Sequence, residues 1–226
     1  PAAGSGRRLG GETPKQYREI AGAPLMEHTL QTLLASPDVR GIVVALDPSD
    51  RRADAIASLA DARVQTVAGG ALRADSVLAG LDLLAKDASD QDWVLVHDAA
   101  RPCLPIESLT ALIDCARARR EGAILAAPVS DTLKQVDESA RVTRTLDRST
   151  LWKAQTPQLF PLLKLRRSLR QCHEEIGGVT DEAMAMEWAG EPVHVVEGPS
   201  SNIKVTVESD LAYVDMILRA KREPLT

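Results

Sequence analysis

The chain has 226 residues, a net charge of −5 and only 3% aromatic residues. This length permits one large α/β domain or two small ones, with a core that needs neither disulfides nor a structural metal. The acidic balance argues against a general nucleic-acid-binding protein, although 27 lysines and arginines could still supply a local phosphate site. The three cysteines lack CxxC spacing, and no membrane span or signal peptide is visible. We therefore expect buried thiols and a cytoplasmic protein without membrane contact.

Short apolar runs alternate with amphipathic stretches, a pattern that predicts a mostly parallel sheet covered by helices. Strands are predicted over residues 41–46, 64–67, 93–97, 123–127 and 193–196. Helices are predicted over residues 25–35, 50–59, 74–84, 106–119, 161–173, 181–188 and 208–221. The apolar runs are nearly continuous, as in strands that are buried on both faces.

Residues 129–148 break this alternation. Two short runs, 132–136 and 142–146, flank the polar segment 137–141, which predicts a β-hairpin inserted into the α/β pattern. An isolated hairpin is only marginally stable in water, so we expect this one to contact a second subunit. The sequence thus predicts a single domain over residues 1–226, with a dimerisation arm at about 129–150.

The N-terminal segment PAAGSGRRLG, followed by Pro14-Lys15, carries the strongest local signal. Small residues let the backbone approach a triphosphate closely, and Arg8 and Lys15 add positive charge around its oxygens. A Gly-Lys-Ser/Thr ending is absent, which excludes a Walker loop, and the glycine spacing does not fit a dinucleotide fingerprint. The strand that such a loop usually follows is not in the sequence, and we expect the natural chain to have further residues before Pro1.

Three further segments carry polar groups suited to a nucleotide site. A second glycine loop, Gly69-Gly70, lies between a predicted strand and helix, and with Ser76 it could hold a base and ribose. Asp98 follows the apolar strand 93–96, where a carboxylate could bind Mg²⁺ or sugar hydroxyls, whereas its neighbour His97 is expected to be a packed residue. Lys204 lies among uncharged residues and could be a second cation at the transferred phosphate.

The motifs recur along the chain as AAGSGRRL with PKQY, GGALRADSVLAGL, VLVHDAARP, AAPVSDTLK, TLDRSTLWKAQTPQLF, TDEAMA and NIKVT. Together they resemble the 2-C-methyl-D-erythritol 4-phosphate cytidylyltransferases of the non-mevalonate isoprenoid pathway. The resemblance covers essentially the whole chain in order. It implies a Rossmann-like, three-layer αβα nucleotidyltransferase fold, a homodimer, and transfer of CMP from CTP to methylerythritol phosphate. The products would be 4-diphosphocytidyl-2-C-methyl-D-erythritol and pyrophosphate.

The resemblance also implies roles by motif position. The residues that would contact CTP are Ala2, Ala3, Gly4, Gly6, Gly70 and Ser76. Arg8 and Lys15 would lie on its phosphates, Asp98 by the substrate and a Mg²⁺ ion, and Lys204 by the α-phosphate and the second substrate.

Thr132, Arg148 and Thr156 of a neighbouring subunit would lie near the methylerythritol phosphate, and Arg8, Lys15, Lys204 and Arg148 would form the catalytic set. Two departures from the family pattern remove possible contacts. Ser201 stands where many members have aspartate, and Ala71 where some have an acid.

A phosphate monoester has a second pKa near ~6, so the attacking oxygen is already ionised at neutral pH and needs no general base. Catalysis would then come from positioning and from neutralising charge on the α-phosphate. Two alternatives stay open at this point: a cytidylyltransferase for another polyol phosphate, such as ribitol 5-phosphate, and a non-catalytic nucleotide-binding module. A dinucleotide-dependent oxidoreductase is excluded by the glycine spacing.

Overall fold

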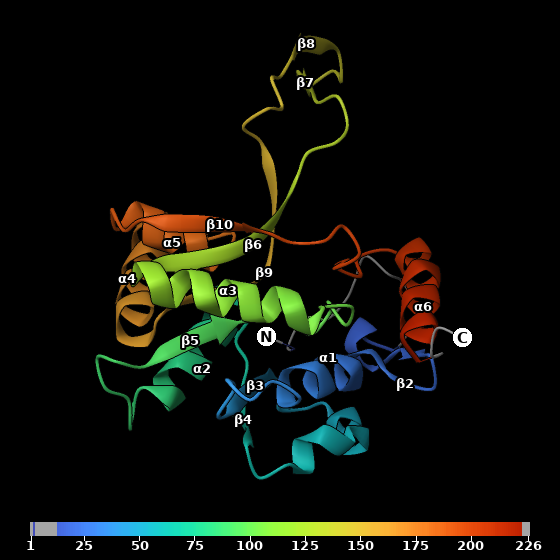
Figure 1. Cartoon of the computed structure of the whole chain (residues 1–226), viewed down its shortest axis with the longest axis vertical. Coiled ribbons are helices and arrows are strands. Elements are labelled where there is room, and N and C mark those ends of the chain that lie inside the picture. Colours follow the sequence, from blue (N-terminus) through green and yellow to red (C-terminus); the bar gives the residue numbers. More distant parts are fainter. Residues whose placement is uncertain (1, 3–12, 223–226) are drawn as a thin grey trace.

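The computed structural model describes Ala2 and residues 13–222. Figure 1 shows helices on both sides of a central sheet and a thin arm that projects away from the body. The α-helices are α1 (Leu25–Leu34), α2 (Arg73–Leu84), α3 (Ile106–Arg119), α4 (Leu162–Ile176), α5 (Glu182–Trp188) and α6 (Glu208–Arg222). The strands of the body are β1 (Glu19–Ile20), β2 (Ala23–Pro24), β3 (Ile42–Leu46), β4 (Val64–Ala68), β5 (Trp93–Val96), β6 (Gly122–Pro128), β9 (Trp152–Pro161) and β10 (Val193–Glu197).

The main sheet has the strand order β10-β6-β9-β5. Strands β10 and β6 are parallel, whereas β9 runs antiparallel to both β6 and β5. Parallel strands β3 and β4 form a separate pair. The long strand β9 was not predicted, because the polar residues and proline of its sequence QTPQ interrupt the apolar pattern.

Alternation along β6 explains the three layers. Ile124 packs with apolar side chains of α2, α4 and α5, while its neighbours Ala123 and Leu125 pack with those of α3 on the opposite face. Both faces of this strand are therefore buried, as its continuous apolar sequence indicates. The fold is the predicted three-layer αβα arrangement.

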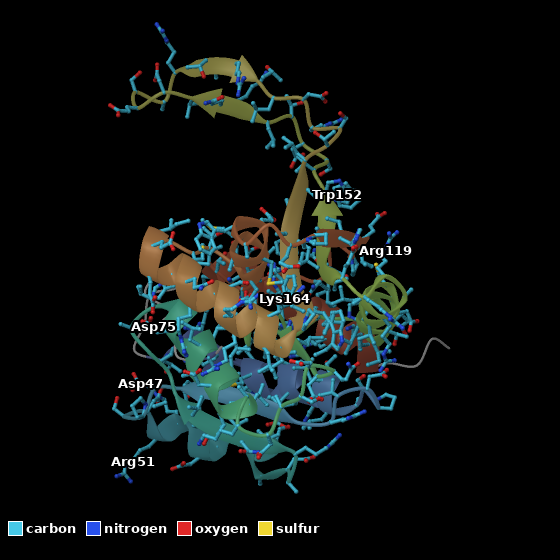
Figure 2. The ribbon with its side chains drawn as sticks, turned by 90° about the vertical axis from the view of Figure 1, so that its left-hand side faces the viewer. Asp47, Arg51, Asp75, Arg119, Trp152 and Lys164 are labelled. Atoms are coloured by element: carbon cyan, nitrogen blue, oxygen red, sulfur yellow. The ribbon has the colours of Figure 1, made fainter. Side chains whose placement is uncertain are left out.

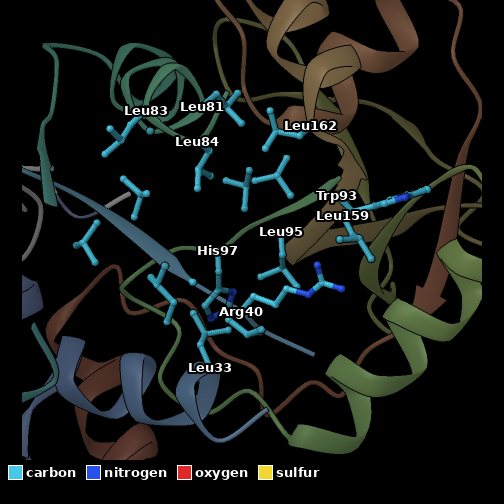
Figure 3. Close-up of a pocket in the computed structure, with 18 of the residues that line it drawn as sticks. Leu33, Arg40, Leu81, Leu83, Leu84, Trp93, Leu95, His97, Leu159 and Leu162 are labelled. Carbon is cyan, nitrogen blue, oxygen red and sulfur yellow. The ribbon is translucent and has the colours of Figure 1, made fainter. Parts of the chain in front are cut away.

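A cavity of about 750 Å³ lies between β3 and β5. Leucines from several elements line it, among them Leu33 of α1, Leu81 of α2 and Leu159 of β9 (Figure 3). At its edge, the backbone N–H of Ala2 donates a hydrogen bond to the carbonyl of Ala45 in β3 (3.0 Å). The cavity lies between the β3–β4 pair and the main sheet, and its lining also includes polar and charged side chains such as Arg40 and His97.

One predicted helix is wrong. Residues 50–59 form two short 3₁₀ turns, Arg51–Ala55 and Ala57–Ala60, instead of one α-helix. The backbone of Ile56 is extended between them (φ −91°, ψ 103°), and its side chain is buried against α1 and β3. The extended backbone of Ile56 interrupts the helix while its side chain packs in the core, so tertiary packing overrides local propensity here.

The predicted hairpin is present as β7 (Lys134–Val136) and β8 (Val142–Thr145), which pair in antiparallel fashion. Every residue of both strands is exposed in the single chain. Figure 2 shows this arm from the side, with Trp152 near the point where the chain returns to the body. The two arm strands therefore hydrogen bond to each other, but within this chain they bury no side chains.

In the described part of the chain, no helix is long and apolar enough to cross a membrane. All three cysteines are free thiols. Cys103 and Cys172 are buried, as predicted, and Cys115 is only partly buried.

Candidate active site

A cavity of about 180 Å³ brings the predicted segments together beyond the carboxyl end of β5. Six of the residues named from the sequence line it: Ala2, Lys15, Gly70, Ser76, Asp98 and Lys204. These residues come from the two ends of the chain, from the loops after β4 and β5, and from the start of α2. Ala3, Gly4, Gly6 and Arg8 lie outside the described residues, so their predicted contacts stay predictions.

The second glycine loop is shaped by the start of α2. Asp75 accepts a hydrogen bond from the backbone N–H of Leu72 (2.9 Å), and Ser76 Oγ accepts one from the N–H of Gly70 (3.1 Å). A Cβ atom at Gly70 would lie 2.2 Å from the Asp75 Cβ, so a side chain at this position would displace the loop. The glycine is thus required by close packing, and Ser76 supports the loop from inside the cavity.

The N-terminal and C-terminal segments meet at Lys15. Its Nζ donates a hydrogen bond to the carbonyl of Val205 (3.0 Å). The next residue, Gln16, is buried and donates to the carbonyl of Ala2 (2.8 Å). These contacts place the Lys15 ammonium in the same cavity as Lys204, although 189 positions separate the two in sequence.

Asp98 is the buried acid at the centre of the cavity. Lys204 Nζ lies 2.7 Å from its Oδ2, and Arg73 Nε lies 3.3 Å from its Oδ1. Burial alone would favour the neutral acid, but the charges of Arg73 and Lys204 hold the pKa of the Asp98 carboxyl well below its ordinary value. Asp98 is therefore a carboxylate with a cation on each oxygen.

The Thr156 hydroxyl hydrogen bonds to the backbone of Asp98, and His97 orients that hydroxyl. His97 Nε2 donates to the carbonyl of Arg101 (3.1 Å), which leaves Nδ1 as the acceptor for the Thr156 hydroxyl (3.0 Å). The Thr156 oxygen in turn accepts the N–H of Asp98 (3.0 Å). Burial lowers the pKa of His97 to about 4, so the ring is neutral and structural, as the sequence predicted.

The partner of Arg73 was not predicted from the sequence. Its two Nη atoms donate to the two carboxylate oxygens of Glu182 (2.6 and 2.9 Å), and Glu182 is fully buried at the start of α5. Burial alone would lower the pKa of the Arg73 guanidinium, but the carboxylates of Glu182 and Asp98 raise it. A glycine loop followed by arginine was a visible signal, but nothing in the sequence shows that residue 182 lies beside it.

Asn202 anchors the segment that carries Lys204. Its side-chain amide donates to Gln155 Oε1 (3.0 Å) and to the carbonyl of Thr156 (2.9 Å), and its own carbonyl accepts from Arg101 Nη1 (2.7 Å). The NIKVT segment is therefore fixed to β9 and to the loop after β5. Among the described residues that line the cavity, three cations (Lys15, Arg73 and Lys204) outnumber the one carboxylate, Asp98, an excess that favours a polyphosphate ligand.

The acceptor residues named from the sequence do not lie together. Thr132 and Arg148 are exposed near the arm, where Arg148 donates to the carbonyl of Ser130. Thr156 is buried in its own chain beside Asp98, which corrects its expected place in a neighbouring subunit's site. The physical reason is that β9 re-enters the sheet of its own body before it reaches Thr156.

The three-layer body places a glycine loop, a strand-end carboxylate and several cations at one site, as expected of an α/β protein that binds a nucleotide. The particular family follows from comparison with known proteins. The family model for 2-C-methyl-D-erythritol 4-phosphate cytidylyltransferase matches residues 1–220. The chain belongs to this family.

Relatives and solved structures agree with this assignment. The chain is 47% identical over 221 residues to the 2-C-methyl-D-erythritol 4-phosphate cytidylyltransferase of Pseudoalteromonas atlantica, covering 98% of this chain and 94% of the relative. It is 48% identical to that of Aeromonas hydrophila, covering 99% and 90%. A Francisella tularensis crystal structure of the same enzyme superposes with a TM-score of 0.81 at 34% identity, covering 96% of each chain. The Thermus thermophilus enzyme gives a TM-score of 0.79 at 28% identity, also covering 96% of each chain.

Proposed function

We propose that this protein is a CTP-dependent cytidylyltransferase that acts on 2-C-methyl-D-erythritol 4-phosphate. It transfers CMP to the substrate phosphate, forming 4-diphosphocytidyl-2-C-methyl-D-erythritol and releasing pyrophosphate. The observation that carries the proposal is the convergence of Lys15, Gly70, Asp98 and Lys204 on one cavity. Family membership supplies the identity of the two substrates.

The reaction is an attack by an oxygen of the substrate phosphate on the α-phosphorus of CTP. A new P–O bond forms as the bond to the pyrophosphate oxygen breaks, and pyrophosphate leaves with that electron pair. The attacking phosphate is largely dianionic at neutral pH, so no proton has to be removed. The neutral His97 is occupied by Arg101 and Thr156, which fits a mechanism without a histidine base.

Lys15 and Lys204 would stabilise the charge that develops on the α-phosphate. The two ammonium groups approach the cavity from opposite ends of the chain and are held by Val205 O and Asp98. In this proposal Arg8 would add a third cation and Arg148 would bind the acceptor phosphate from the partner subunit.

Magnesium is part of the proposal. Within the described residues, no cluster of three histidine, cysteine or acidic side chains could form a protein-only metal site. Mg²⁺ often binds through one or two carboxylates plus substrate phosphates, and Asp98 fits that role once Lys204 leaves its Oδ2 atom. When bound, the ion would neutralise negative charge on the triphosphate.

The arm supports a homodimer. Val136 and Val142 face each other across the hairpin and are 50% and 55% exposed in the single chain. An exposed apolar pair on a hairpin without a core favours contact with another subunit. We expect Thr132 and Arg148 to reach the partner's site through this arm. The free thiols support a reducing compartment, and we propose a cytoplasmic location.

A competition assay tests the proposed reaction. Pyrophosphate release is measured with CTP and Mg²⁺ while methylerythritol phosphate and ribitol 5-phosphate compete as acceptors. We expect methylerythritol phosphate to be consumed almost exclusively. Preferential use of ribitol phosphate would assign the chain to another polyol phosphate, and CTP binding without pyrophosphate release would identify a non-catalytic nucleotide-binding module.

The oligomeric state is tested separately by light scattering. The unchanged protein should have the mass of a dimer, and Val136→Asp/Val142→Asp should shift it toward monomer. Val207→Asp, at an exposed valine outside the arm, is the matched control. A monomeric unchanged protein at micromolar concentration would contradict the dimer proposal.

A further inference from the structure

The guanidinium of Arg73 joins two carboxylates that lie on different elements. It makes a two-pronged contact to Glu182 through both Nη atoms, and its Nε lies 3.3 Å from Asp98 Oδ1. The planar guanidinium has a fixed geometry, so gripping Glu182 also fixes the direction in which Nε–H points. Glu182 therefore orients the Arg73 side chain for its contact with Asp98.

Glu182 itself is held in place on both sides. The N–H of Ala183, the next residue, donates to Gln158 Oε1 (2.9 Å), and Gln158 also donates to Asp181, the N-cap of α5 (2.9 Å). Gln158 lies in β9 and is 1% exposed. The sheet therefore fixes the start of α5, the start of α5 fixes Glu182, and Glu182 fixes Arg73.

Lys204 cannot keep its full contact with Asp98 and also bind the substrate phosphate. In the structure Lys204 Nζ is bound to Asp98 Oδ2 (2.7 Å). The proposed reaction needs this ammonium on a phosphate, so it must give up or share that contact. Asp98 is only 6% exposed, and a buried carboxylate without any partner is strongly unfavourable, so another cation must stay on Asp98 when Lys204 leaves.

We propose that Arg73, held by Glu182, is a positioning residue that keeps Asp98 paired and oriented while Lys204 moves to the substrate phosphate. This inference rests on the proposed function for the role of Lys204. Arg101 is the other cation described near Asp98, but its Nε lies 3.9 Å from Oδ2, beyond hydrogen-bond distance, and its Nη1 is bound to Asn202. Among the described side chains, Arg73 therefore remains as the hydrogen-bonding partner of Asp98 when Lys204 leaves.

The first experiment separates positioning from simple neutralisation of Glu182. Arg73→Met alone would leave Glu182 buried and unpaired and could prevent folding. The double variant Arg73→Met/Glu182→Met removes both charges and keeps side chains of similar length. If Arg73 only neutralises Glu182, the double variant should regain normal activity. If Arg73 positions Asp98, its kcat/KM should stay about 10–100-fold below that of the unchanged protein.

A matched control removes an ion pair outside the site. Lys164 and Glu191 form a 2.8 Å pair between α4 and the turn after α5. Lys164→Met/Glu191→Met should keep kcat/KM within about twofold, since neither residue lines the cavity. A kcat/KM of the Arg73/Glu182 double variant within that same twofold range would overturn the inference.

The second experiment does not depend on turnover. Lys204→Met is introduced into the unchanged protein and into the Arg73→Met/Glu182→Met background, and the fall in Tm is measured in each. With Arg73 present, Asp98 keeps one partner, so the fall should be small. Without Arg73, the same change leaves Asp98 with no hydrogen-bonding side chain among the described residues, so the fall should be at least about twice as large.

The two experiments distinguish the inference from the proposed function. If the unchanged protein releases no pyrophosphate with methylerythritol phosphate, the proposed function fails, and the Tm comparison still decides whether Arg73 can hold Asp98 without Lys204. Equal falls in Tm in the two backgrounds would overturn the inference even if the enzyme is fully active.

Discussion

Protonation of His97 should make the folded protein lose stability in mild acid. Burial lowers the pKa of this side chain to about 4 from an ordinary value of 6.5. Between these values the unfolded chain binds a proton that the folded chain does not, so stability rises with pH and falls as the pH drops below 6.5. The free energy of unfolding should decrease by about 2 kcal/mol from this one group between pH 7.5 and pH 5.

The measurement is urea unfolding at several pH values for the unchanged protein and for His97→Gln. Glutamine does not titrate, and its amide can still donate toward the Arg101 carbonyl that now accepts from His97 Nε2. The other three histidines are present in both proteins, so their contributions cancel in the difference. Stability curves of the two proteins that run parallel from pH 7.5 to pH 5 would refute the reasoning.

Three further predictions follow from the site. Lys15→Ala and Lys204→Ala should each lower turnover on the order of 10²–10³-fold, as for loss of one transition-state contact, while the fold survives; near-normal turnover in either variant contradicts its assigned role. Gly70→Ala should lower kcat/KM for CTP on the order of 10²-fold in a steady-state assay, because the new Cβ would lie 2.2 Å from the Asp75 Cβ and must displace the loop. Unchanged kinetics would show that the position of this loop is unimportant for CTP use. Thr156→Val should reduce the free energy of unfolding in urea by about 1–3 kcal/mol for each buried group that it leaves unpaired, whereas Thr156→Ser should keep most of the original stability. Equal stability of all three proteins would argue against the hydrogen-bond chain Asp98–Thr156–His97.

Much of the site could be predicted because its parts are local. The Gly69-Gly70 loop lies between a strand and a helix in both the sequence pattern and the structure, and Asp98 follows a buried strand in both. Such positions gather at the carboxyl ends of strands in α/β proteins, so their convergence could be expected. The arm was also visible, because two short runs flank a polar turn.

Other features depend on contacts between distant segments. The bidentate contact between Arg73 and Glu182 joins residues 109 positions apart, and no local pattern marks it. Strand β9 was hidden because its polar side chains are satisfied inside the fold, where Gln158 holds the start of α5 and the Thr156 hydroxyl holds Asp98. Polar residues that are buried by such bonds look like loop residues in a sequence.

The sequence by itself determined the α/β class, the Gly69-Gly70 loop, the strand-end acid and the family resemblance, because periodicity, small residues and motif spacing are properties of neighbouring residues. The tertiary structure decided which cation faces which carboxylate. It paired Lys204 and Arg73 with the two oxygens of Asp98, and it buried Thr156 beside its own chain's Asp98. Those pairings follow from how β5, β9, α2 and α5 pack on one another. These elements are far apart in the sequence, so no local pattern records which of their side chains meet.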